Sequence, residues 1–98
     1  MEESMELFRS ETGGEFRCTR LALHGDGSIA MDTQDIGSTA DEMFGEREHD
    51  FTLTIPPQAL PRLVFVLLAE RFGGKPDSVE RLRALCRSEG VPHSFSNR

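Results

Sequence analysis

The sequence lacks tryptophan and tyrosine altogether and has only two cysteines among its 98 residues. Two cysteines without a recognisable spacing do not make a disulfide framework, which favours a reducing compartment. Long apolar runs are also missing, because the longest, at 63–69, has seven residues against the ~20 that a membrane-spanning helix needs. The first residues lack the basic and apolar regions of a signal peptide. We therefore expect a soluble cytoplasmic protein.

Basic residues are scarce, since 11 Lys and Arg stand against 17 Asp and Glu, a net charge of −6. Phosphate backbones and anionic membranes require clustered Lys and Arg, so we expect no nucleic-acid partner and no membrane partner. The charge is also uneven. Residues 1–59 carry 4 basic and 13 acidic side chains, a net of −9, and residues 60–98 carry 7 and 4, a net of +3. The sequence predicts an acidic front half and a mildly basic back half.

Length and periodicity predict the architecture. A chain this short holds one hydrophobic core, so we expect a single domain over 1–98, with a β-rich acidic part at 1–55 and a helical part at 56–98. Alternation of apolar and polar residues predicts four strands, at 4–10, 15–24, 28–34 and 49–55. The turn sequence Gly25-Asp26-Gly27 predicts a hairpin between the second and third strands.

Two helices are expected after the strands. An apolar helix at 60–72 ends at Gly73-Gly74, and a second helix begins after Asp77 and ends at Gly90. Asp77 and Glu80 have the spacing of a capping box. The predicted fold class is therefore α+β, a largely antiparallel four-stranded sheet in β-β-β-β-α-α order with both helices on one face. A meander is the default strand order.

One polar cluster has residue types suited to metal binding or acid–base chemistry, namely His24, Asp26, Asp32 and His49. Both histidines lie at ends of predicted strands, so they form a site only if those ends meet. No two histidines have the spacing of a metal motif. The alternative is that these are solvated turn residues. Cys18 and Cys86 continue apolar patterns and are expected to be small buried residues, so no catalytic residue and no cofactor is predicted.

The first helix has more apolar surface than a helix lying on a sheet requires. Its apolar run covers the whole circumference, and one side is formed by Phe65, Leu68 and Phe72. This side is a candidate surface for a homodimer or another protein. The alternative is that the second helix and Phe95 cover it.

The polar connection before the fourth strand is a second candidate for protein binding. Apolar anchors flanked by carboxylates suit recognition of a basic partner. The residues concerned are Asp41, Glu42, Met43, Phe44 and Glu46. The alternative is a solvated connection in which Met43 and Phe44 fill the core.

Three short motifs occur in order along the chain: Asp35-Ile36-Gly37, Phe44-Gly45 and the strand sequence Asp50-Phe51-Thr52-Leu53. In this order they resemble small acidic bacterial proteins over residues 25–65. The chain departs from them in having His49 and Phe51 where Tyr or Trp is more frequent. The resemblance implies a bacterial cytosolic origin and implies no activity.

The leading hypothesis is a non-catalytic, acidic protein-binding domain, an inhibitor or immunity-type partner of a basic protein. It depends on the acidic front half and on the lack of a catalytic motif. One alternative is a metal-binding domain or metal-dependent enzyme that uses His24, Asp26, Asp32 and His49. The other is a structural homodimer formed through the first helix.

Overall fold

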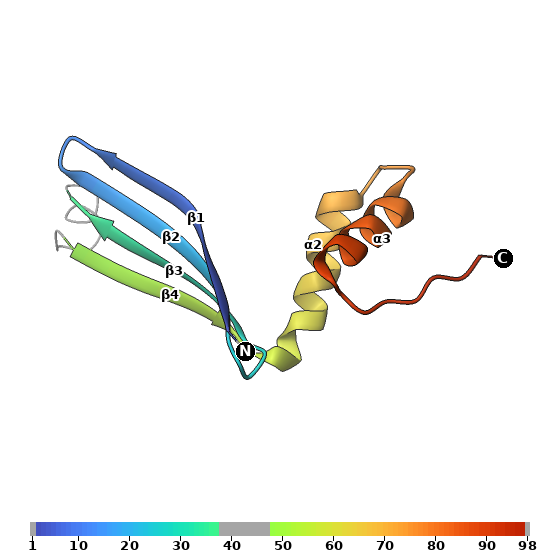
Figure 1. Cartoon of the computed structure of the whole chain (residues 1–98). Helices are drawn as coiled ribbons and strands as arrows, with labels where there is room; N and C mark the ends of the chain where they lie inside the picture. The colour runs from blue at the N-terminus through green and yellow to red at the C-terminus, as the bar shows by residue number, and fades with distance from the viewer. Residues whose placement is uncertain (1, 38–47, 98) are drawn as a thin grey trace. The chain divides into compact units, whose positions relative to one another are not determined.

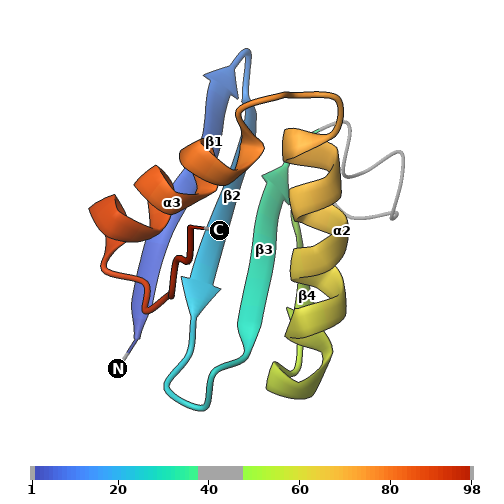
Figure 2. The same ribbon diagram turned by 90° about the vertical axis from the view of Figure 1, so that its right-hand side faces the viewer.

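The computed structural model describes residues 2–37 and 48–97 (Figure 1). It divides into two compact units, Met1–Pro61 and Arg62–Arg98, and each is described by itself. The order is four strands followed by two helices, which confirms the α+β class (Figure 2). The expected single domain, and the expected coverage of one sheet face by the helices, stay predictions.

The first unit is an antiparallel sheet of β1 (Glu3–Thr12), β2 (Glu15–Leu23), β3 (Ile29–Ile36) and β4 (Glu48–Ile55). The strands lie in the order β1-β2-β3-β4, so the expected meander is confirmed (Figure 1). Each strand was predicted within two residues at either end. The expected hairpin between β2 and β3 is also confirmed, because the two strands pair antiparallel up to Leu23 and Ile29. Inside the turn, the Asp26 carboxylate accepts hydrogen bonds from the Ser28 amide at 2.9 Å and the Ser28 hydroxyl at 2.6 Å.

Strand register sorts the side chains onto two faces. Leu21, Met31 and Leu53 are paired across three strands and therefore share one face. We call this the apolar face, and it also includes Met5, Leu23, Ile29 and Ile55. The opposite, polar face carries Glu6, Arg9, Glu11, Arg20, Asp32, Glu48 and Asp50. The sheet therefore presents one apolar and one charged surface.

A β-bulge at Leu7 interrupts the alternation in β1. Glu6 pairs with Arg20 and Phe8 pairs with Thr19, so Leu7 is the extra residue. In a regular strand Glu6 and Arg9 would point to opposite faces, because they are three residues apart. The bulge shifts the parity by one and places both on the polar face, within reach of each other.

A 3-10 turn at Pro57–Ala59 leads into α2 (Leu60–Phe72), which has the predicted bounds. The second helix, α3, spans Ser78–Glu89 and ends at Gly90, whose φ of 68° is the left-handed conformation expected of a terminating glycine. The predicted capping box is wrong. Asp77 makes no side-chain capping bond and instead accepts a hydrogen bond from Arg81 Nε at 2.7 Å, because that guanidinium lies one turn further along the same helix.

Among the described residues, few side chains are fully enclosed. The buried apolar residues are Cys18 and Ala30, and the buried polar residues are Ser28, Thr33 and Asp35. The prediction that Cys18 is buried is therefore confirmed, whereas Cys86 is only half-buried. Large apolar side chains on the sheet stay exposed, Leu53 by 66%. In the described part of the chain, no helix has the length and apolar character needed to cross a bilayer.

Candidate functional site

The two histidines of the metal hypothesis lie at opposite ends of the sheet. His24 directly follows Leu23, which pairs with Ile29 at the start of β3. His49 pairs with Asp35, near the end of β3. Six residues of β3 separate these positions, a distance of about 20 Å at the rise of a strand. The structure therefore does not bring His24 and His49 together.

The two aspartates of that hypothesis are also apart. Asp26 is engaged in the hairpin by Ser28, which holds the pKa of its carboxyl below the usual range. Asp32 points to the polar face, whereas His49 is on the other side of the sheet. Across residues 2–37 and 48–97, no group of three or more His, Cys, Asp or Glu side chains is arranged to hold a metal ion.

The two predicted protein-binding surfaces have different outcomes. Asp41, Glu42, Met43, Phe44 and Glu46 lie outside the described residues. The helix surface lies on α2, where Phe65 is exposed and Leu68 and Phe72 are half-buried. Phe95, expected to fold back on the helices, lies beneath the Arg83 guanidinium at 4.2 Å from its ring centre and remains exposed.

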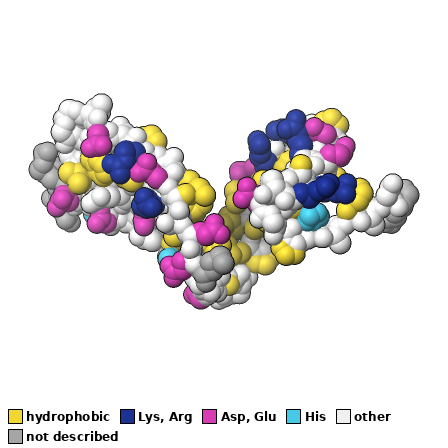
Figure 3. Space-filling model, in the orientation of Figure 1, with side chains coloured by type: hydrophobic (Ala, Val, Ile, Leu, Met, Phe, Trp, Pro, Cys, Tyr) yellow, Lys and Arg dark blue, Asp and Glu magenta, His cyan; other side chains and the backbone are white. Residues whose placement is uncertain are grey.

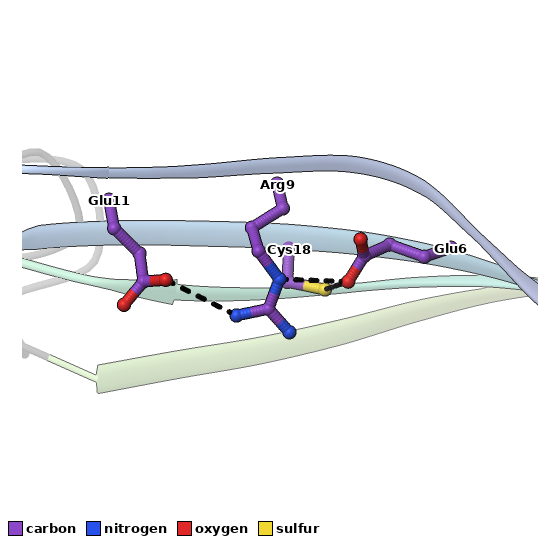
Figure 4. Close-up of polar contacts among 4 residues, drawn as sticks. All are labelled: Glu6, Arg9, Glu11 and Cys18. Atoms are coloured by element: carbon purple, nitrogen blue, oxygen red, sulfur yellow. Dashed lines mark hydrogen bonds and ion pairs between the residues drawn. The ribbon is translucent and has the colours of Figure 1, made fainter.

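On the polar face, three charged residues of β1, Glu6, Arg9 and Glu11, are paired with one another. Figure 4 shows the Arg9 guanidinium between two carboxylates, donating to Glu6 at 2.9 Å and to Glu11 at 3.5 Å. Arg9 also lies over the Phe16 ring, 5.2 Å from its centre. The hydrogen bond from Arg9 is the main cause that lowers the pKa of Glu6. These charges are satisfied within the sheet.

The Cys18 thiol completes this cluster without being activated by it. Its Sγ donates to Glu6 Oε1 at 3.4 Å, and the residue is 8% exposed. Burial, followed by the neighbouring Glu6 carboxylate, raises the pKa of the Cys18 thiol. A thiol held protonated is a poor nucleophile, so this environment is the reverse of the one that catalytic cysteines require.

Over β3 and β4 the same face carries carboxylates without partners. Asp32 and Asp50 line a hollow of about 350 Å³, together with Arg20, Gln34 and Thr52. The Arg20 guanidinium donates to Ser4 at 3.5 Å. Neither aspartate has a hydrogen bond or ion pair to any other described residue. Among the described residues, this part of the polar face therefore carries two carboxylates without an ion-pair partner, beside the single cation Arg20.

The two aspartates are neighbours by register. Asp32 pairs with Thr52, and Asp50 lies two residues before Thr52 on the same face of β4. Diagonal neighbours of this kind are about 7–8 Å apart. Sequence reasoning selected Asp32 for a metal site and missed Asp50. The missed signal is the alternation in β4, because of which the Asp50 side chain points to the face opposite that of Phe51 and Leu53.

One end of the apolar face carries polar contacts that no local pattern predicted. Arg17 Nη1 donates to Asp35 Oδ2 at 3.2 Å, and the Asp35 side chain is only 6% exposed. The Thr19 and Thr33 hydroxyls are 2.9 Å apart on the same face. Arg17 also lies over the Phe51 ring, 5.8 Å from its centre. These contacts join β2, β3 and β4 and support the strands that carry the two aspartates.

Figure 3 shows acidic and basic side chains next to one another over the sheet. Within this pattern the paired charges of β1 are distinct from Arg20, Asp32 and Asp50, which have no ion pair among the described residues. No family model matches the chain, and neither a curated protein nor a solved structure matches it. The function is therefore inferred from the site alone.

Proposed function

We propose that this chain is a non-catalytic protein-binding module whose polar sheet face docks a partner of net positive charge. The observation that carries the proposal is the pair Asp32 and Asp50, two carboxylates on one face of adjacent strands without an ion-pair partner among the described residues. They line a hollow that is large enough to admit a side chain from another protein.

The chemistry of the pair suits a basic side chain. A guanidinium or ammonium group that enters the hollow meets two carboxylates about 7–8 Å apart, and hydrogen bonds between such charged groups are stronger than neutral ones. Gln34 and Thr52 supply further polar groups beside the carboxylates. Arg20 also lines the hollow, so its charged side chains sum to −1, and the two carboxylates still offer an arginine or lysine both charge and hydrogen-bond partners.

Longer-range charge supports the same partner. The front half of the chain has a net charge of −9, so its field attracts a basic protein before contact is made. Such a field raises the association rate at low ionic strength. A module that covers the basic surface of another protein blocks that surface, so we propose an inhibitor or immunity-type role.

Two observations favour binding over catalysis. Burial raises the pKa of the Cys18 thiol, which lines the same hollow as the two aspartates. No histidine of the described strands lies on the polar face, since His49 points to the other side. The hollow is thus supplied with carboxylates but with neither an activated nucleophile nor an imidazole base.

The proposal is tested with a fluorescent oligoarginine peptide as the probe. Fluorescence anisotropy measures its affinity for the full chain, for D32N/D50N, and for the control E80Q/E89Q, which removes the same charge from α3. We expect D32N/D50N to weaken binding about five- to thirtyfold, because two ion pairs of ~0.5–1 kcal/mol each are lost. The control should change it less than about twofold.

A series of salt concentrations completes the test. The affinity of the wild-type chain should fall as salt rises, because exposed ion pairs are screened. Equal weakening by D32N/D50N and E80Q/E89Q would show that net charge alone attracts the probe, and would contradict a site on the polar face. Binding that is insensitive to salt would contradict the electrostatic basis of the proposal.

A further inference from the structure

Helix α2 carries an exposed ridge formed by Arg62, Val66 and Glu70. These residues are spaced by four, so they follow one another along one side of the helix, within about 40° on either side of Val66. In the described part of the helical unit, taken by itself, no other element covers these three residues. The half-buried Leu68 and Phe72 lie well round the helix from the ridge, whereas the half-buried Leu63 lies about 60° from Val66. The ridge is therefore not the side on which Leu68 and Phe72 are enclosed.

Apolar residues flank the ridge on both sides. Phe65 and Leu67 stand about 100° from Val66 in opposite directions, and both are exposed, Phe65 by 65%. The helix is thus apolar on both sides of the ridge, and the ridge itself is charged only at its two ends. A helix that is apolar around its whole circumference is typical of one that is covered on more than one side.

The charges at the two ends of the ridge oppose the helix dipole. A helix is stabilised by acidic residues in its first turn and basic residues in its last. Arg62 lies in the first turn of α2, which has no acidic residue, and Glu70 lies in the last turn. Both positions therefore carry the less favourable sign for the isolated helix.

Within the described residues of the helical unit, neither Arg62 nor Glu70 has an ion pair. The Arg62 guanidinium lies over the Phe65 ring, 5.5 Å from its centre, so this guanidinium stays beside the apolar side of the ridge that Phe65 forms. A cation and an anion are thus presented at equal spacings from Val66, about 6 Å along the axis on either side.

We propose that the α2 ridge is a self-association surface, on which two copies of the chain pair antiparallel about a two-fold axis at Val66. In this arrangement Arg62 of each copy faces Glu70 of the other, because both lie four residues from the axis. Two-fold pairing requires a self-complementary surface, and the ridge is one. Packing of one i, i+4 ridge against another is the commonest way in which helices meet.

The occupant is a second copy because the charges fit in that case without any other component. A single basic or acidic partner would satisfy only one end of the ridge, whereas a second α2 satisfies both. One short helix from each copy buries a small area, so the dimer is weak and depends on concentration. The inference is separate from the proposed function, because it uses none of the residues of the polar face.

The experiment is sedimentation equilibrium of the full chain at a series of loading concentrations, with a reductant to exclude disulfide dimers through Cys86. The variants are R62E, E70R, the double reversal R62E/E70R, and R71E as the control. Arg71 lies on the same helix about 140° from Val66, so R71E makes the same charge change away from the ridge. Circular dichroism checks that each variant remains folded.

We expect a reversible wild-type dimer. R62E and E70R should each raise its dissociation constant at least about tenfold, because two cross-copy pairs become repulsive in every dimer. R62E/E70R should restore the constant to within about threefold, and R71E should leave it within about threefold. Both single reversals agree with the helix dipole, so melting of α2 does not explain a loss of the dimer.

Three results would overturn the inference. A wild-type chain that stays monomeric at every concentration shows that the ridge has no such role. A dimer that R62E and E70R do not weaken forms through another surface. A double reversal that dissociates like the single variants shows that Arg62 and Glu70 do not face each other across the two-fold axis.

Discussion

The pair between Arg17 and Asp35 gives the sharpest prediction of stability. The Arg17 side chain is 44% exposed and the Asp35 side chain 6%, at an N–O distance of 3.2 Å. Loss of the Arg17 charge is therefore not equivalent to loss of the Asp35 charge. Removing Arg17 leaves a carboxylate without its partner in a buried position, whereas neutralising Asp35 leaves a guanidinium that water can reach. We expect R17M to be the more damaging change.

The magnitude follows from these positions. At 3.2 Å and an effective dielectric constant of ~20 the attraction is about 5 kcal/mol, and desolvation of the carboxylate together with solvent screening at the exposed Arg17 offsets most of it. A net loss of about 2 kcal/mol is expected for R17M, which corresponds to a fall of about 8–16 °C in Tm. D35N should cost about 1 kcal/mol or less, because its guanidinium partner rehydrates.

Methionine is the chosen replacement because it keeps an apolar stem beside the Phe51 ring, over which Arg17 lies. Urea denaturation gives the free energy of unfolding of each variant. R17M/D35N should be about 1 kcal/mol more stable than R17M, since the second change removes the stranded charge. R20M is the control on the opposite face, with an expected loss below about 0.5 kcal/mol. A double variant no more stable than R17M would refute a buried, charge-dependent pair.

Two further predictions concern single groups. The Ser28 hydrogen bonds lower the pKa of Asp26, so its folded pKa lies below its unfolded one and its stabilisation is present above the unfolded pKa; urea denaturation over a pH series should show the gap between wild type and D26N shrinking as pH falls below about 4, and a constant gap would contradict this link. Iodoacetamide followed by mass spectrometry should modify the half-buried Cys86 before Cys18, because Cys18 is buried and its pKa is raised, and faster modification of Cys18 would contradict the described environment.

Local patterns were sufficient to predict the elements of this fold. The seven apolar residues of α2, with glycines directly after Phe72, gave the bounds of that helix correctly. Strict alternation in β4 gave its orientation, and the Gly-Asp-Gly turn gave the hairpin between β2 and β3. Each of these signals depends on neighbours in the sequence, which is why they could be interpreted without a structure.

Features that depend on non-local pairing were not predictable. The bulge at Leu7 adds one residue to β1, and only this shift brings Arg9 beside Glu6. The ion pair between Arg17 and Asp35 depends on the register of β2 with β3. The capping box at Asp77 failed for a local reason, since Arg81 competes for the same carboxylate and lowers the pKa of Asp77. Spacing alone does not say which of two local partners a carboxylate chooses.

The same limit explains why the candidate site was found only in part. Asp32 drew attention as a potential ligand, but its neighbour is Asp50, from a strand that begins beyond a long connection. The net charge of −6 did not distinguish them from Glu6 and Glu11, which are satisfied by Arg9. Only the register shows which carboxylates are paired.

Pairing, rather than the number of charges, is what makes a surface available for binding. A carboxylate that already holds a guanidinium gains little from a partner, because the new contact must replace the old one. An unpaired carboxylate gives up only bound water when a partner arrives. A facing anion also stabilises an arginine whose charge interacts unfavourably with the dipole of its own helix. Within the described residues of their own units, two pairs of residues lack an ion pair in this way: Asp32 and Asp50 on the sheet, and Arg62 and Glu70 on α2. Each pair requires a partner of different composition. The first requires a basic protein, whereas the second is complementary to itself, so charge variants of one surface should leave the binding of the other unchanged.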